Sequence, residues 1–272
     1  MGILMKSFKT FIAEDLELLL MSAKSDKYEL DVANNITGMT GVTAERPKVS
    51  TKYADVTLDF KGKSKHKGKR IWLEVKMSHT DNLGNTRVSY VDGKWQAAMP
   101  LDPVKNFAIK YLTTSSQTQK FLKDIANYAG IKDWRNMTVP STQGFLKKDN
   151  AVPYDIMKEY MSKRTQYILD VPNVDLGALV TDHYLTGKAE PAYYMQAGDD
   201  FYLIGKENPL GLPRDIPELG KKGQCMGTFK MRIGVRGSKP FYEIQPEIKI
   251  SDMPNSPYSV KPGTKKKNPF ES

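Results

Sequence analysis

The chain has 272 residues, and its 41 Lys and Arg residues exceed its 31 Asp and Glu residues by ten. A hydrophobic content of 39% can fill a core and argues against disorder over the whole chain, and no apolar run approaches the roughly 20 residues of a membrane span. The single cysteine, Cys225, excludes an internal disulfide and predicts a reducing, cytoplasmic compartment.

Hydrophobic periodicity predicts a mixed α/β protein. In chain order, the pattern predicts helices over 8–20 and 25–38, strands over 53–60, 70–77 and 87–91, helices over 102–130 and 154–169, and β-hairpins over 192–205 and 227–250. The hairpins are expected to turn at Gly198-Asp199 and Gly237-Ser238, and Pro103 is expected in the first turn of its helix. Nothing in the pattern resembles a hinge between independent domains, so a single elaborated domain is predicted over residues 1–250.

The positive charge is unevenly distributed along the chain. Residues 61–70 hold six cations and no acidic residue: Lys61, Lys63, Lys65, Lys67, Lys69 and Arg70. Such a cluster would bind a polyanion by releasing counterions, and a solvated basic surface is the alternative interpretation. A second cluster, Lys265-Lys266-Lys267, lies where Pro, Ser and Gly are frequent and apolar residues few, so residues 251–272 are predicted to form a disordered basic tail.

Residues 53–60 and 70–77 alternate strictly and predict an antiparallel hairpin joined by the cationic loop. Apolar residues occupy one face of each strand: Val56, Leu58, Phe60, Ile71, Leu73 and Val75. Two registers bury both apolar faces together, and they place Asp55 opposite either Glu74 or Lys76. In both registers these three polar residues lie within about 5–8 Å of one another.

Two carboxylates and an ammonium at this separation suit metal-assisted hydrolysis of a phosphodiester. Mg²⁺ takes a few carboxylate oxygens, keeps several waters and leaves positions for phosphate oxygens. A bound metal lowers the pKa of its water. A neighbouring lysine would orient that water, deprotonate it if the lysine pKa were lowered, or stabilise the charge that develops on the phosphate.

A charged, solvated sheet face is the competing interpretation, since cross-strand ion pairs on such a face contribute less than about 1 kcal/mol each. A second Glu-x-Lys, formed by Glu247 and Lys249, lacks an acid on the strand before it and fits that description. The first copy has the partner acid Asp55, a fixed register and adjacent cations, which favours catalysis there.

Aromatic residues near cations leave two interpretations open. Those of the late hairpins form either a platform for bases and phosphates or part of the core: Tyr193, Tyr194, Phe201, Tyr202 and Phe229. Trp72, on the polar face of the first hairpin, either walls the site or packs under the helix that follows Asp102.

Asp55, followed after eighteen residues by Glu74-Val75-Lys76, resembles the signature of the PD-(D/E)XK nuclease superfamily, with Ala54 in place of the nominal proline. In that superfamily the acid begins one strand of a hairpin and the second motif ends the next. The resemblance implies a restriction-endonuclease-like α/β core, a mixed central sheet flanked by helices, over about residues 25–130. The remainder, about residues 131–250 with its C-terminal β-hairpins, would then be DNA-reading extensions.

The resemblance also implies roles for individual residues. Asp55 and Glu74 would bind the metal, the Val75 carbonyl would add a ligand, and Lys76 would position the water. A helix before the hairpin often contributes another carboxylate in this family, and Glu29 is implied for that role ahead of upstream acids such as Glu14.

One residue outside the hairpin is retained as a candidate. The Gln-x-x-x-Tyr motif of some superfamily members is absent, but Gln96 would contact DNA or a metal-bound water. The opening residues MKSFKTFIAEDLE resemble the start of many T4-like phage proteins, which implies a phage-encoded, homing or restriction-like enzyme.

The leading hypothesis is therefore a Mg²⁺-dependent endonuclease of double-stranded DNA, with Mn²⁺ able to substitute. No nucleotide cofactor is expected because the phosphate-binding motif G-x-x-x-x-G-K-[ST] is missing. Two-strand cleavage would require either a homodimer or sequential nicks. A non-catalytic nucleic-acid-binding or virion-associated phage protein is the alternative from a different class, and a nuclease of RNA is the third.

Overall fold

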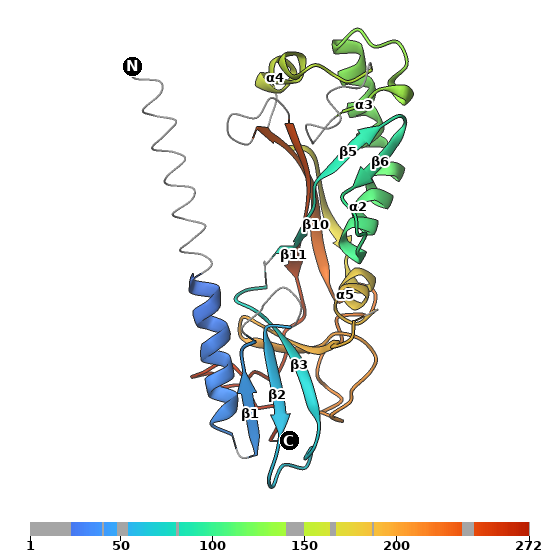
Figure 1. The fold of residues 1–272 in the computed structure, drawn as a ribbon. Helices are drawn as coiled ribbons and strands as arrows, with labels where there is room; N and C mark the ends of the chain where they lie inside the picture. Colours follow the sequence, from blue (N-terminus) through green and yellow to red (C-terminus); the bar gives the residue numbers. More distant parts are fainter. Residues whose placement is uncertain are drawn as a thin grey trace, which may run out of the picture. The chain divides into compact units, whose positions relative to one another are not determined.

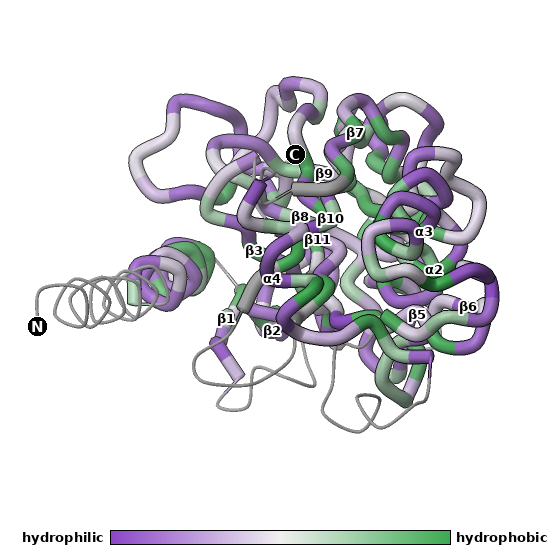
Figure 2. The backbone as a smooth tube through the Cα atoms, turned by 90° about the horizontal axis from the view of Figure 1, so that it is seen from above, coloured by the Kyte–Doolittle hydropathy of each residue, from purple (hydrophilic) through white to green (hydrophobic). Residues whose placement is uncertain are grey.

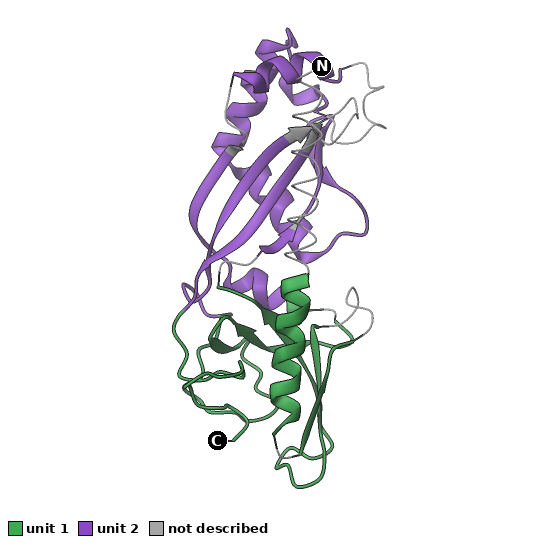
Figure 3. Cartoon of the chain, turned by 90° about the vertical axis from the view of Figure 1, so that its left-hand side faces the viewer, with its two compact units in different colours: residues 1–79, 184–220, 254–272 green, residues 80–183, 221–253 purple. Residues whose placement is uncertain are grey.

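A computed structural model describes residues 23–39, 41–47, 54–79, 82–139, 150–163, 167–186, 188–235 and 242–271. The protein has a mixed α/β fold with two β-sheets (Figure 1). It divides into two compact units, each assembled from separate stretches of chain (Figure 3). Unit 1 comprises residues 1–79, 184–220 and 254–272, and unit 2 comprises residues 80–183 and 221–253. The single elaborated domain predicted over residues 1–250 thus contains two compact units. Periodicity did not indicate this division, because it shows which residues form a strand but not which sheet the strand joins.

The sheet of unit 1 has five strands in the order β1-β2-β3-β8-β9. Their bounds are β1 Val42–Glu45, β2 Val56–Phe60, β3 Arg70–Lys76, β8 Ala192–Ala197 and β9 Asp200–Leu203. The first three strands are antiparallel neighbours, β8 lies parallel to β3, and β9 returns antiparallel to β8. Parallel neighbours need a long crossover connection, and the chain between β3 and β8 contains most of unit 2.

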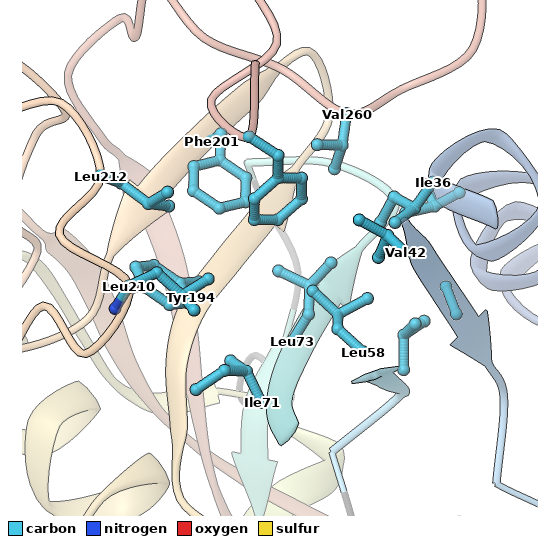
Figure 4. Close-up of a cluster of buried hydrophobic side chains, with 14 of the residues drawn as sticks. Ile36, Val42, Leu58, Ile71, Leu73, Tyr194, Phe201, Leu210, Leu212 and Val260 are labelled. Atoms are coloured by element: carbon cyan, nitrogen blue, oxygen red, sulfur yellow. The ribbon is translucent and has the colours of Figure 1, made fainter. Parts of the chain in front are cut away.

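The core of unit 1 lies between this sheet and a helix over residues 23–37. Val32 and Ile36, four residues apart, share the helix face that is fully buried. Figure 4 shows Leu58 and Leu73 of the hairpin pointing toward Phe201 of β9 in the same apolar cluster. The predicted hairpin turn at Gly198 is confirmed, and Gly198 has a φ of 54°.

The C-terminal segment is not a disordered tail. Tyr258, Val260 and Phe270 are buried in the core of unit 1, and the Ser259 amide donates to the Lys267 carbonyl at 3.0 Å. The few apolar side chains of this segment are thus placed where they reach the core. The Pro and Gly residues between them form turns.

Unit 2 contains a sheet in the order β6-β5-β11-β10-β7, with β4 beside β11. The bounds are β4 Asn82–Asn85, β5 Val88–Val91, β6 Lys94–Ala97, β7 Tyr167–Asp175, β10 Met226–Val235 and β11 Tyr242–Asp252. The helices are α2 Pro103–Thr114, α3 Ser116–Tyr128, α4 Tyr154–Ser162 and α5 Gly177–Tyr184, with a short 3₁₀ helix at Trp134–Asn136. Tyr184, the last residue of α5, belongs to unit 1.

The helical stretch predicted over residues 102–130 is two helices with separate caps. Asp102 caps α2 by accepting from the Lys105 amide, and Pro103 stands in the first turn as predicted. Ser115 ends α2 and its side chain caps α3. Buried positions on α3 recur at helical spacing, and Figure 2 shows hydrophilic and hydrophobic residues alternating along its tube.

Several other predictions are corrected in this unit. The helix predicted over residues 154–169 ends at Ser162, and Tyr167 begins β7, which pairs with β10. The predicted strand over residues 87–91 exists as β5 but belongs to the sheet of unit 2, so the expected contiguous core over residues 25–130 is divided between the units. The predicted helix over residues 8–20 and the turn at Gly237-Ser238 lie outside the described residues.

The aromatic residues of the late hairpins are core residues and not a binding platform. Tyr194, Phe201, Tyr202 and Phe229 are fully buried, while Tyr193 is partly buried against the core. Within the described ranges, no helix is both long and apolar enough to cross a membrane.

Gly41 controls how the loop after β2 packs. Its φ is +77°, its carbonyl accepts from the Lys61 amide at 2.8 Å, and an added Cβ would lie 2.6 Å from the Lys61 carbonyl oxygen. We expect Gly41→Ala to lower the free energy of unfolding by about 2 kcal/mol or more, because alanine is strained at a positive φ and its Cβ would clash with the Lys61 carbonyl oxygen. Gly62→Ala is the matched control: its φ is +62° but nothing lies within 4 Å of its Cβ, so it should lose only about 1 kcal/mol. Urea denaturation measures both, and equal losses would show that the close approach is unimportant.

Candidate active site

The hairpin register is one of the two predicted from the apolar alternation. Val56 pairs with Leu73 and Leu58 with Ile71, and all four side chains are buried. One step beyond the last paired residues, this register brings Asp55 beside Glu74. The Asp55 carboxylate accepts a hydrogen bond from the Val75 amide at 2.9 Å, which holds it across the end of β3.

Glu74 and Lys76 lie on the same face of β3, two residues apart. The Lys76 ammonium is 2.7 Å from the Glu74 carboxylate, and these side chains are only 19% and 9% exposed. A solvated sheet face would leave such groups open to water. The three residues predicted to converge therefore do so in a largely buried setting, at the open end of the hairpin.

Burial dominates the electrostatics of this cluster. Burial first and the neighbouring charge of Glu74 second raise the pKa of Asp55 to about 8, although Lys76 and the hydrogen bond from the Val75 amide act in the opposite direction. For Lys76, burial alone would lower the pKa, but the attraction of Glu74 outweighs it and the pKa is raised well above its ordinary value. Lys76 is therefore a cation at neutral pH in the metal-free site, which favours the predicted roles of orienting water and stabilising charge over the deprotonation of water.

Glu29 lies beside the site but is held by a cation. It is on the helix over residues 23–37, it is 7% exposed, and its carboxylate accepts from the Arg46 guanidinium at 2.5 Å and from the Ser25 hydroxyl at 3.1 Å. The charge of Glu29 contributes to the raised pKa of Asp55, which places the two carboxylates in one electrostatic cluster. Glu29 would have to exchange Arg46 for a metal to act as the predicted ligand.

Three residues that the sequence pattern did not connect with the site, Tyr184, Tyr28 and Gly198, contact its residues, the end of β3 or each other. Tyr184, at the end of α5, is buried and hydrogen-bonds Glu74; burial, then the charge of Glu74, raises its pKa. Tyr28 donates to the Gly198 carbonyl at 2.6 Å, and the Gly198 amide donates to the Lys76 carbonyl at 2.9 Å. The end of β3 is thereby tied to a helix and to the β8–β9 turn. None of these partners is close to the hairpin in sequence, so no local pattern could have indicated them.

His79 is a further residue of this region that sequence spacing did not single out. Its Nε2 is 3.0 Å from the buried carboxylate of Asp200 and 3.3 Å from the Tyr202 hydroxyl. Lys266 also contacts Asp200, at 2.6 Å. An imidazole held in this way lies three residues after Lys76 and close to the Gly198 turn.

The donor set fits a hard divalent cation. Asp55 and Glu74 supply carboxylate oxygens, the kind of ligand that Mg²⁺ and Mn²⁺ prefer. The described residues contain no group of three or more His, Cys, Asp and Glu side chains arranged to hold a metal, so the site offers two carboxylates and would leave the remaining positions to carbonyl oxygen or water. The side chain of Val75 is in the core, and its carbonyl remains the predicted third ligand.

The cationic loop is ordered but distant from the carboxylates. Residues 61–70 form successive turns, and His66 is buried with its ring edge-on to Phe60 at 5.3 Å between centroids. Burial, then Lys65 and Lys69, lowers the pKa of His66, so a neutral ring anchors the loop. All six cations of the loop are exposed. The five residues of β2 separate the start of the loop from Asp55 by about 17 Å. Phosphates bound by the loop would therefore lie about five base pairs from the cut.

Two predicted features belong to unit 2, whereas the residues of this cluster belong to unit 1. Gln96 is exposed on β6, opposite Ser89 of β5. The second Glu-x-Lys differs from the predicted solvated face, since Glu247 is buried and lies 3.2 Å from Arg232, whereas Lys249 is exposed.

No family model matches this chain, and the searches of curated proteins and of solved structures give no match either. Inferences about function therefore depend on the residues and the geometry of the site.

Proposed function

We propose that the protein is a Mg²⁺-dependent endonuclease of the PD-(D/E)XK type, phage-encoded and acting on DNA in the host cytoplasm. The observation that carries the proposal is the buried convergence of Asp55, Glu74 and Lys76 at the end of one hairpin. The acid begins one strand and the Glu-x-Lys ends the next, which is the order that the resemblance implies.

The chain's own residues would divide the work as follows. Asp55 and Glu74, with the Val75 carbonyl, would hold Mg²⁺ or Mn²⁺, and the bound metal would supply a water of lowered pKa and neutralise charge on the phosphate. Lys76, a partly buried cation at neutral pH, would stabilise the negative charge that develops on the scissile phosphate and orient the attacking water. Tyr184 would keep the Glu74 carboxylate in its rotamer through their hydrogen bond.

Incubation of supercoiled plasmid DNA with the full chain tests the proposal. We expect nicking or linearisation in Mg²⁺ or Mn²⁺ and none in EDTA, and labelled duplex DNA and RNA compared side by side identify the substrate. Retarded migration of DNA without cleavage in either metal would instead favour the non-catalytic nucleic-acid-binding or virion-associated alternative. If the protein is a monomer and its product is nicked rather than linear, the two strands are cut one after the other and not together by a homodimer.

The cationic loop makes a separate prediction about affinity. Replacing Lys63, Lys65 and Lys67 with Gln should weaken duplex binding and reduce the slope of log K against log salt by about 2–3, since each lost phosphate contact removes about 0.9. Cleavage per bound complex should change little because the loop is remote from the carboxylates. The control removes three exposed lysines of unit 2, Lys110, Lys120 and Lys132; an equal change of slope in that variant would argue against a specific role for the loop.

A further inference from the structure

A cavity of about 350 Å³ opens on the polar face of the unit 1 sheet, beside the candidate active site. Its floor is a row of directly paired residues across three strands: Glu45 of β1, Thr57 of β2 and Trp72 of β3. Arg46, Arg70 and Glu190 line it from the sides. This volume is at the small end of the range for ligand pockets, about 300–1,000 Å³.

The floor of the cavity lies two residues along the strands from the carboxylates. Asp55 precedes Thr57 by two residues and Glu74 follows Trp72 by two, so all four side chains project from one face. Two residues of strand span about 7 Å. A ligand group in the cavity would therefore be a near neighbour of a phosphate held by Asp55, Glu74 and Lys76, at a separation that one nucleotide can bridge.

Trp72 provides an apolar surface on an otherwise polar face. It is half-buried, and it is flanked within its own strand by Arg70 and Glu74. An indole in such surroundings is a stacking surface for a flat ring, and stacking on aromatic residues is the main sequence-tolerant contact that proteins make with unpaired bases.

Charged groups surround that surface. Arg70 lies 3.2 Å from Asp59, and Arg46 is held by Glu29 at 2.5 Å, so each guanidinium group at the cavity has an acidic partner on the sheet or the helix of unit 1. A guanidinium binds phosphate oxygens in a fork and also stacks on flat rings. The cavity therefore offers both a cationic contact and an aromatic contact to the same ligand.

An unpaired oxygen of Glu190 indicates which chemical group the ligand presents to the cavity wall. Its Oε2 is buried and, within the described residues, has no hydrogen-bond partner although two arginines line the same cavity. A buried carboxylate oxygen without a donor is costly and calls for a ligand that brings one. Among bases, an exocyclic amino group is such a donor, and carboxylate side chains accept from the cytosine amine in this way.

We propose that this cavity binds one unstacked nucleobase next to the scissile phosphate, lying on Trp72 and donating an amino group to Glu190. The proposal rests on the nuclease function and deepens it by naming the substrate class. A base inside a duplex cannot enter the cavity, because it must first leave its stack. The substrate is therefore DNA that is single-stranded or locally unpaired beside the cut, and bases with an amino group, such as cytosine, are preferred to thymine at that position.

Binding measured without metal tests this independently of cleavage. Fluorescence anisotropy of labelled oligo(dC) and oligo(dT), each about ten nucleotides long, is measured with the full chain in EDTA. We expect wild type to bind oligo(dC) about fivefold more tightly than oligo(dT). Trp72→Ala should weaken both by about tenfold, whereas Trp72→Phe, which keeps an aromatic face, should retain most of the affinity. Glu190→Gln, whose amide both donates and accepts, should remove the preference for oligo(dC).

Trp134→Ala, at an indole of unit 2, is the matched control and should bind as wild type. The inference is overturned if Trp72→Ala and Glu190→Gln, both shown to be folded by circular dichroism, bind the two oligonucleotides as wild type does. If plasmid is cut in Mg²⁺ while these variants are unaffected, this inference fails and the nuclease proposal stands. If the base preference depends on Trp72 and Glu190 but nothing is cut in Mg²⁺ or Mn²⁺, the nuclease proposal fails and the nucleobase site stands.

Discussion

Lys76→Ala should reduce Mg²⁺-dependent cleavage of DNA by about 10³-fold or more, with DNA affinity changed by less than about threefold. The ammonium is partly buried next to Glu74 and carries a charge at neutral pH, so its loss removes an interaction with the transition state that water replaces poorly. Glu74→Gln and Asp55→Ala should lose cleavage to a similar extent, because each removes a carboxylate from the metal. Single-turnover cleavage and filter binding measure the two quantities separately.

The chain contains its own control for this experiment. Lys249 ends the second Glu-x-Lys, is exposed on β11 and lies in unit 2. Lys249→Ala should cut DNA at the wild-type rate. Because Lys76→Ala leaves Glu74 buried without its cation, which destabilises by about 3–5 kcal/mol in comparable pairs, Lys76→Gln is included to keep a hydrogen-bond donor. Wild-type cleavage by a folded Lys76→Gln or Glu74→Gln would contradict the proposed mechanism.

The double variant Glu74→Gln, Lys76→Ala adds a second criterion. Groups that act together in one catalytic step have strongly non-additive effects, so the double variant should be little slower than the worse of the two single variants. Additive losses would indicate that the two residues contribute through separate steps.

The part of the site that could be predicted from the sequence is the part fixed by local pattern. Strict alternation over residues 53–60 and 70–77 determined two strands, and the requirement to bury Val56 and Leu73 together limited the register to two possibilities, one of which the structure has. The convergence of Asp55 with Glu74 then followed from strand geometry.

Features that depend on distant parts of the chain could not be predicted. Periodicity identified residues 87–91 and 192–205 equally well as extended, but it does not state that β8 and not β5 lies next to β3. The hydrogen bond from Tyr184 to Glu74 has the same character, because it joins two stretches of unit 1 that are separated in the sequence by most of unit 2. The composition of either stretch does not contain that information.

The tail shows a different limit of sequence reasoning. A low apolar content over residues 251–272 predicts disorder on average, yet Tyr258 and Phe270 are enough to anchor the segment when each fills a place in the core of unit 1. Lys266 adds a contact to the buried carboxylate of Asp200. Average composition measures how much apolar surface is present, whereas order here depends on where each side chain is placed.

Asp55→Asn should make the metal-free protein more stable at pH 8 while eliminating cleavage. Burial and the charge of Glu74 raise the pKa of Asp55 from 3.8 to about 8 in the folded state, whereas the unfolded chain has the ordinary value of about 3.9. Between these values the native state binds more protons than the unfolded state, so the free energy of unfolding falls as pH rises. Asparagine carries no charge and can still accept from the Val75 amide, so the variant avoids this loss.

We expect the variant to equal wild type near pH 4 and to exceed it by about 2 kcal/mol at pH 8, measured by urea denaturation in EDTA across this range. Asp59→Asn is the matched control: Asp59 lies on the same face of β2 but is partly exposed and paired with Arg70, so its effect should stay below about 1 kcal/mol at every pH. Added Mg²⁺ should stabilise wild type and leave Asp55→Asn unchanged, since a ligand stabilises only the state that binds it. If the variant is less stable than wild type at pH 8, or if the difference does not grow with pH, then the folded protein does not raise the pKa of Asp55 and the metal-free carboxylate is not destabilising.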